Sequence, residues 1–90
     1  AHSIIVTLRE LNPDALFADG FEDALIGWTA NLHHTLVAAY DLPRCVEILM
    51  FRDGASEEEA REYIDFNVLG AYVGEHTPLF IETLASPDDY

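Results

Sequence analysis

The chain has 90 residues, half of them hydrophobic and ten of them aromatic. This length fits one domain, and such a composition predicts a folded chain rather than a disordered one. Seventeen acids stand against four arginines and no lysine, which gives a formal net charge of -13. This charge argues against direct binding to nucleic acid or to an anionic membrane surface, because both depend on basic groups.

The cysteine count and the apolar runs indicate where the protein works. Cys45 is the single cysteine, so no intrachain disulfide can form, and a reducing setting is expected. No apolar run approaches the roughly 20 residues of a membrane span, and the amino end lacks a signal pattern. We therefore expect a cytoplasmic protein. Its acidity has three explanations, which are adaptation to high salt, a basic protein partner (nucleic-acid mimicry included) and solubility.

The first half of the chain predicts two short strands and a helix. The segment "SIIVTL", residues 3–8, is β-branched and apolar enough for a strand, and "NPD" at 12–14 is a turn signal. Asp19 can cap a helix through "FEDALIGW", whose apolar residues recur at helical spacing (Phe21, Leu25 and Trp28). The apolar run "LVAAY", residues 36–40, is compatible with a buried strand.

The second half predicts two helices with marked ends. Asp41 lies at the N-cap position of the first, Pro43 in its first turn, and Gly54 at a left-handed C-cap. Its apolar positions predict burial on more than one side (Leu42, Cys45, Val46, Ile48, Leu49 and Phe51). Ser56 and Glu59 match a capping box for the last helix, which we expect to continue to a C-cap at Gly74.

These elements predict a small α+β fold in one domain, residues 1–90. The domain is mainly α-helical, with three helices and two short strands. The last few residues, within "SPDDY", are expected to form a loose tail.

Asn67 is the unexpected residue of the last helix. It falls on the apolar stripe of that helix (Ala60, Tyr63, Ile64, Val68 and Ala71). A buried amide costs free energy unless it is hydrogen-bonded, so we expect Asn67 either to bond within the domain or to face a pocket. Glu75 and His76 follow where the helix is expected to end. Asp41, Asn67, Glu75 and His76 therefore form the candidate ligand or interaction site.

A second apolar face is predicted on the same helix. It comprises Phe66, Leu69, Gly70 and Val73, and Gly70 would let another helix approach closely. This face predicts a homodimer in which the same patch meets itself. The alternative is that the amino-terminal strand or the segment "PLFIETL" covers it within one chain, and both alternatives stay open.

Motifs of catalysis and metal binding are missing from the sequence. There is no P-loop, no GxGxxG and no GxSxG, so no cofactor is expected and enzymatic activity is not favoured. His33 and His34 are adjacent and lack an i,i+4 partner, which argues against a metal site. Cys45 has no neighbouring base in sequence and is interpreted as a core thiol.

The segments "GFEDALIGW", "VAAYD" and "RCVEILMFRDGASEEEAREYIDFNVLGAYVGEHTP" together resemble a family of short uncharacterised proteins found in bacteriophage and environmental genomes. The resemblance covers most of the chain, residues 20–80. It implies a phage-like accessory protein in the cytoplasm of a host cell, and it brings no established activity with it.

Two functions follow from these observations. The first is a small acidic, non-enzymatic accessory protein that binds a protein partner, which would be basic if the acidic surface makes the contact. The alternative is a small enzyme or ligand-binding protein with a carboxylate, asparagine and histidine site at the end of the last helix. Convergence of the four site residues in one pocket would favour the alternative.

Overall fold

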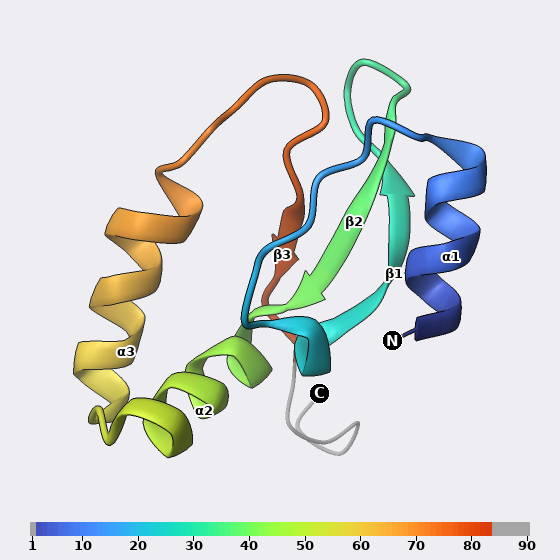
Figure 1. The fold of residues 1–90 in the computed structure, drawn as a ribbon. Coiled ribbons are helices and arrows are strands. Elements are labelled where there is room, and N and C mark those ends of the chain that lie inside the picture. The colour runs from blue at the N-terminus through green and yellow to red at the C-terminus, as the bar shows by residue number, and fades with distance from the viewer. Residues whose placement is uncertain (1, 84–90) are drawn as a thin grey trace.

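The computed structural model describes residues 2–83, so the predicted tail at 86–90 lies outside the described residues. Figure 1 shows helices around a small twisted sheet. The elements in chain order are α1 (His2–Leu11), η1 (Glu22–Ala24), β1 (Leu25–Ala30), β2 (Leu36–Asp41), α2 (Leu42–Asp53), α3 (Glu57–Ile64), η2 (Asp65–Leu69) and β3 (Leu79–Ile81). The α+β class is confirmed, and the described sheet has one strand more than predicted.

The sheet has the order β1-β2-β3. β1 and β2 form an antiparallel hairpin, and β3 returns parallel to β2 after the chain has passed through α2 and α3. Tyr40 of β2 is the register partner of Phe80 of β3, and their rings stack with centroids 5.1 Å apart. The predicted strand at 36–40 is confirmed by β2, whereas the three-residue β3 was too short to leave a periodic signal.

The predicted strand at 3–8 is wrong, because these residues belong to α1. Leu8 is fully buried, and Ile4 and Ile5 pack against the same core. Their spacing of three and four residues places them on one helical face. Burial of that face outweighs the weak β preference of the isoleucines. Asn12 precedes Pro13, a position that disfavours helix, and α1 ends at Leu11.

The predicted helix from Asp19 is also wrong. The segment forms only the short 3-10 turn η1, whose N-cap is Phe21 and has no side-chain cap, and the strand β1 follows at once. The Glu22 carboxylate accepts from the backbone N–H of Gly20 rather than completing a capping box. Trp28 pairs with Ala38 across the hairpin. Hydrogen bonding to β2 therefore makes this segment a strand, although the spacing of its apolar residues had predicted a helix.

The predicted N-caps of α2 and α3 and the predicted C-cap of α2 are confirmed. The Asp41 carboxylate accepts from the backbone N–H of Arg44, and Gly54 adopts a left-handed φ of 69° after α2. Ser56 and Glu59 form both hydrogen bonds of the capping box, at 3.1 and 3.0 Å. The predicted burial of α2 on more than one side is wrong at Phe51, which is 85% exposed.

One hydrophobic core joins the elements. It includes buried residues from α1, η1, β1, β2, α2 and α3 (Leu8, Phe21, Ala24, Leu25, Ala38, Tyr40, Cys45, Val46, Leu49, Ala60 and Ile64). The Tyr40 hydroxyl accepts from the backbone N–H of Ala18 at 2.8 Å, which holds the segment 12–21 against the sheet. Within residues 2–83 no helix has both the length and the hydropathy needed to cross a membrane.

Candidate functional site

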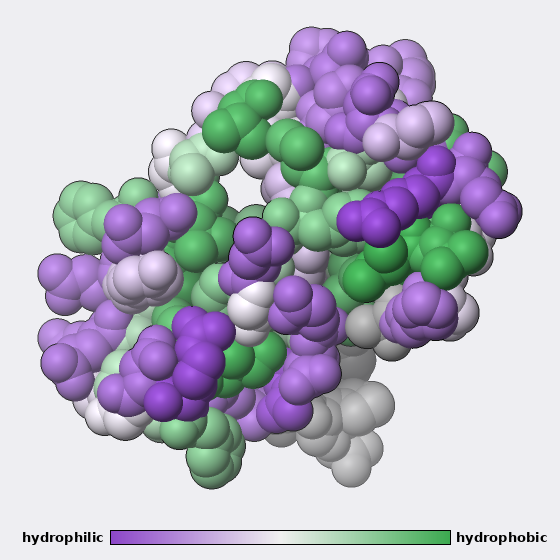
Figure 2. Space-filling model, viewed as in Figure 1, coloured by the Kyte–Doolittle hydropathy of each residue, from purple (hydrophilic) through white to green (hydrophobic). Residues whose placement is uncertain are grey.

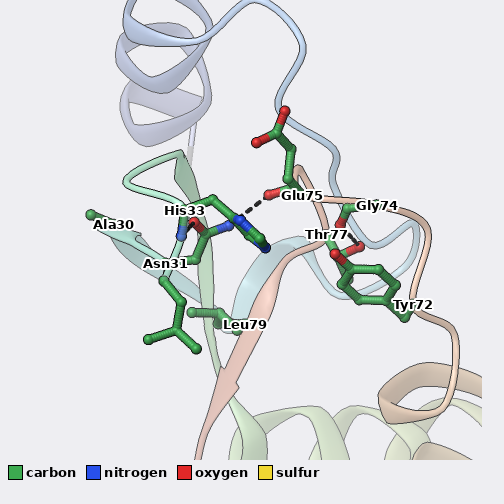
Figure 3. A pocket seen from close by; sticks show the side chains of 9 residues that line it. Ala30, Asn31, His33, Tyr72, Gly74, Glu75, Thr77 and Leu79 are labelled. Atoms are coloured by element: carbon green, nitrogen blue, oxygen red, sulfur yellow. Dashed lines mark hydrogen bonds between the residues drawn. The ribbon is translucent and has the colours of Figure 1, made fainter.

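The turn that contains Glu75 is hydrogen-bonded to the turn between β1 and β2. Asn31 organises the hairpin turn, since its Oδ1 accepts from the backbone N–H groups of His33 and Thr35 at 2.8 and 3.1 Å. Its Nδ2 donates to the Glu75 carbonyl at 2.6 Å, as Figure 3 shows. The Thr35 hydroxyl donates to the Glu75 carboxylate at 3.0 Å. The backbone carbonyl and the side-chain carboxylate of Glu75 therefore both hold this turn to the hairpin.

His76 joins the same contacts through the "NPD" turn. The side-chain nitrogen of Asn12 donates to the Leu36 carbonyl at 2.8 Å and lies 3.1 Å from His76 Nδ1. An amide nitrogen only donates, so this contact places Nδ1 in the acceptor role. Nε2 lies 3.9 Å from a carboxylate oxygen of Glu75. The structure thus brings Glu75 and His76 together, in the turn that leads to β3 rather than at the end of a helix.

A hollow of about 420 Å³ opens beside this junction, and we refer to it as the hairpin hollow. Its lining is mainly apolar (Ala30, Asn31, Leu32, His33, Tyr72, Gly74, Glu75, Thr77 and Leu79). Figure 3 shows the Glu75 carboxylate directed away from Tyr72 and Leu79. The Thr77 hydroxyl is already hydrogen-bonded to the Gly74 carbonyl at 2.6 Å. This geometry suits the binding of an apolar group better than acid–base chemistry, which needs convergent titratable groups.

Asp41 does not join Glu75 and His76. It lies at the carboxyl end of β2, where its carboxylate caps α2 and accepts from the Thr83 hydroxyl at 2.8 Å. The hairpin turn is at the other end of this strand, and a strand rises about 3.3 Å per residue, so about 16 Å separates the two ends. The role of Asp41 visible in the structure is to begin α2.

Asn67 lies apart from Asp41 and from the turn at Glu75 and His76. It is exposed, so its predicted burial is wrong. The chain leaves α3 in a π-helical turn, η2, in which the backbone N–H bonds five residues back rather than four. The Asn67 side-chain nitrogen donates to the Tyr63 carbonyl at 3.1 Å. This is the carbonyl that the backbone N–H of Asn67 would reach in an α-helix. The turn ends at Leu69, so the predicted helix to Gly74 is also wrong.

Tyr63 and Asn67 form the boundary between two neighbouring hollows. The deep hollow, about 370 Å³, lies between the segment 16–21, the end of α3 and the approach to β3, with Phe17, Val68 and Phe80 among its walls. Figure 2 shows it as an opening bordered largely by hydrophobic residues, beneath the arch of the loop after η2. The shallow hollow is lined by Glu59, Glu62, Tyr63, Phe66 and Asn67. We call the two together the α3 groove.

The charges around the α3 groove are negative. Glu59 is engaged in the capping box, whose hydrogen bonds from Ser56 lower the pKa of the Glu59 carboxyl. Glu62 is exposed and makes no hydrogen bond or ion pair to the part of the chain that the structure describes. The four arginines all have partners: Arg44 pairs with Glu47, Arg61 with Glu57 and Glu82, Arg52 with Asp53, and Arg9 lies over the Phe17 ring.

The predicted second apolar face is exposed. Phe66 is 76% exposed, Leu69 44% and Val73 63%, and Tyr72 beside them is 68% exposed. The alternative that the amino-terminal segment or "PLFIETL" covers this face is wrong for the described residues. Gly70 does not bring another element close, because a Cβ there would first meet the Phe66 and Asp65 carbonyl oxygens of its own turn. We call Phe66, Leu69, Tyr72 and Val73 the exposed face.

Cys45 lies in the hydrophobic core. The Cys45 thiol is 1% exposed, and burial raises its pKa to about 12, so the core-thiol interpretation is confirmed. Between residues 2 and 83 no three His, Cys, Asp or Glu side chains lie close enough together to hold a metal ion.

No family model, curated protein or solved structure matches the chain. The interpretation of its function therefore depends on the geometry described above.

Sequence reasoning missed the aromatic walls of the α3 groove and the two asparagines, Asn12 and Asn31, that contact the turn at Glu75 and His76. The asparagines had a signal, since Asn12 and Asn31 stand in turn sequences where their side chains bond nearby backbone groups. The walls had none, because Phe17 and Phe80 line one hollow although more than sixty residues of chain separate them.

Proposed function

We propose that the protein is a non-enzymatic binding module that contacts a protein partner through the exposed face. The observation that carries this proposal is the exposure of Phe66, Leu69, Tyr72 and Val73, four large apolar side chains, within eight consecutive residues. Apolar side chains that gather on a surface are characteristic of interaction sites, and aromatic residues are enriched in them. The loop junction at Glu75 and His76 holds one end of this segment in place.

The partner that fits is a basic protein. The chain carries a net charge of -13, and Glu62 and Asp65 stand beside Phe66 and are exposed. A partner with cations around an apolar patch gains attraction in the encounter as well as burial in the complex. A second copy of this chain brings the same negative charge to the contact and is repelled at low salt.

The setting that we propose for this interaction is the cytoplasm, as a phage-like accessory protein within a host cell. The buried, unpaired Cys45 supports a reducing compartment, and the resemblance to short phage proteins supports the origin. Adaptation to high salt and nucleic-acid mimicry are two further uses of the same acidic surface. The second of these agrees with a basic partner.

The test is affinity capture with matched variants in the exposed face. We expect the wild type to retain a basic protein from lysate of the source cells, and the double variant Phe66→Ser, Tyr72→Ser to lose it. Phe51→Ser is the control, because Phe51 is 85% exposed on α2 and lies outside the exposed face. Equal capture by all three proteins would contradict the proposal.

Sedimentation tests the homodimer prediction. Because two copies with the same negative charge repel each other at low salt, the proposal of a basic partner predicts a monomer in 50 mM sodium chloride. This holds at about 100 μM protein, well above the micromolar dissociation constants of ordinary weak complexes. A dimer at that salt concentration that Leu69→Glu returns to monomer would assign the exposed face to a second copy instead.

A second candidate function is the binding of a small apolar ligand in the hairpin hollow. Its volume, about 420 Å³, is in the range of ligand pockets. Fragment binding that shifts the amide signals of Leu32 and Leu79, and that Leu79→Glu abolishes, would support this function.

A further inference from the structure

We infer that the α3 groove binds a basic amphipathic segment of the partner, with one apolar side chain in the deep hollow and a lysine or arginine at Glu62. The inference rests on the proposed function, and it specifies where and by what chemistry the partner is recognised. The groove adjoins the exposed face at Phe66, which lines the shallow hollow. One extended contact can therefore include both.

The deep hollow has the size and the lining for an apolar side chain. Its volume is about 370 Å³, whereas a cavity of about 150 Å³ is enough for benzene. Phe17, Val68 and Phe80 supply aromatic and aliphatic walls. The hollow is open to solvent, so a side chain of a partner can enter it.

The shallow hollow supplies the polar contacts that such a segment needs. Glu62 is an exposed carboxylate with no partner among residues 2–83, and it can pair with a cation. Tyr63, half exposed between the two hollows, presents a ring on which a cation can stack. The Asn67 side chain uses its nitrogen to bond Tyr63, which leaves its oxygen available to a backbone N–H of the segment.

The chemistry of the groove favours a segment from another protein over one from this chain. A second copy has no lysine, and its four arginines already contact groups of their own chain. The chain's own last residues, 84–90, carry two aspartates and no cation. Charge complementarity at Glu62 therefore requires a partner that brings its own basic residues.

The test uses a synthetic amphipathic peptide of about twelve residues, with tryptophans on one helical face and lysines on the other. We expect fluorescence anisotropy at low salt to show binding, and expect it to be lost when serine replaces the tryptophans or glutamate replaces the lysines. In the wild-type protein the peptide should shift the amide signals of Tyr63, Asn67 and Phe80. This mapping requires no variant and so is independent of any folding defect.

Two variants place the peptide in the groove. Ala71 is exposed and lines the deep hollow, so Ala71→Trp should fill it and weaken binding about tenfold or more. Glu62→Lys should weaken binding about fivefold, because it replaces an attraction by a repulsion. Glu10→Lys makes the same charge change on α1 and should leave binding within about twofold of wild type.

The outcomes separate this inference from the proposed function. Shifts confined to other residues, or equal weakening by Glu62→Lys and Glu10→Lys, would overturn the groove as the binding site. Capture of a partner that depends on Phe66 and Tyr72 but is unaffected by Ala71→Trp would retain the proposed function and reject the inference. Peptide binding that Ala71→Trp abolishes and that Tyr72→Ser, outside the groove, leaves unchanged would support the groove and reject the exposed face.

Discussion

At the scale of single residues, Tyr40 connects the segment 12–21 to the sheet. Its hydroxyl accepts from the Ala18 N–H at 2.8 Å, and its ring stacks on Phe80. Tyr40→Phe keeps the stacking and removes the acceptor, so we expect the free energy of unfolding to fall by about 1 kcal/mol. Urea denaturation measures this change. Tyr72→Phe, on an exposed ring, is the control and should have no effect.

Cys45 makes stability depend on pH in the alkaline range. The unfolded thiol has an ordinary pKa of 9.0, and burial raises the pKa of the folded thiol to about 12. Between these values the unfolded state releases a proton that the folded state keeps, so stability is complete below pH 9 and falls as pH rises. We expect a shallower fall in Cys45→Ala. Parallel slopes for the two proteins between pH 9 and 10.5 would contradict this.

At the scale of elements, the capping box makes α3 sensitive to acid. Hydrogen bonds from Ser56 lower the pKa of Glu59 below its ordinary 4.5. The stabilisation is therefore present above about pH 4.5 and is lost as pH falls through the lower folded value. Glu59→Gln should melt below wild type at pH 7 and approach it at pH 2. Glu58→Gln, on an exposed residue outside the box, is the control.

Ser56→Ala tests the other half of the same box. The Ser56 hydroxyl accepts from the Glu59 N–H at 3.1 Å. Removing an N-cap side chain costs about 1 kcal/mol. Chemical denaturation at pH 7 should show this loss, and an unchanged midpoint would mean that packing of Ala60 and Ile64 alone determines where α3 begins.

At the scale of the whole molecule, like charges oppose the fold. The net charge is -13, and the arginine pairs are few and exposed. Salt shortens the Debye length from about 30 Å at 10 mM to about 3 Å at 1 M, so the melting temperature should rise across that series. The double variant Glu58→Gln, Glu62→Gln should rise less. A flat or falling series in the wild type would show that the carboxylates do not repel one another measurably.

The sequence by itself determined those helix ends that depend only on residues nearby in the chain. The N-caps of α2 and α3 depend on side chains within four residues of the backbone groups that they satisfy, so Asp41, Ser56 and Glu59 were predicted correctly. The C-cap of α2 was predicted correctly because glycine readily adopts the left-handed φ found at Gly54. The buried thiol and the strand at 36–40 followed from apolar patterns that agree with the core. The α+β class followed from these elements together.

The tertiary structure decided the elements and sites that distant segments make. Helix or strand at 3–8 and at 25–30 depended on which face could be buried and which strand was available to pair, because local preferences there are worth only tenths of a kcal/mol per residue. Glu75 and His76 met the hairpin through Asn12 and Asn31, while Asp41 and Asn67 went elsewhere. The α3 groove exists because the segment 16–21, α3 and β3 border one space without filling it, and no pattern within any of them encodes that space.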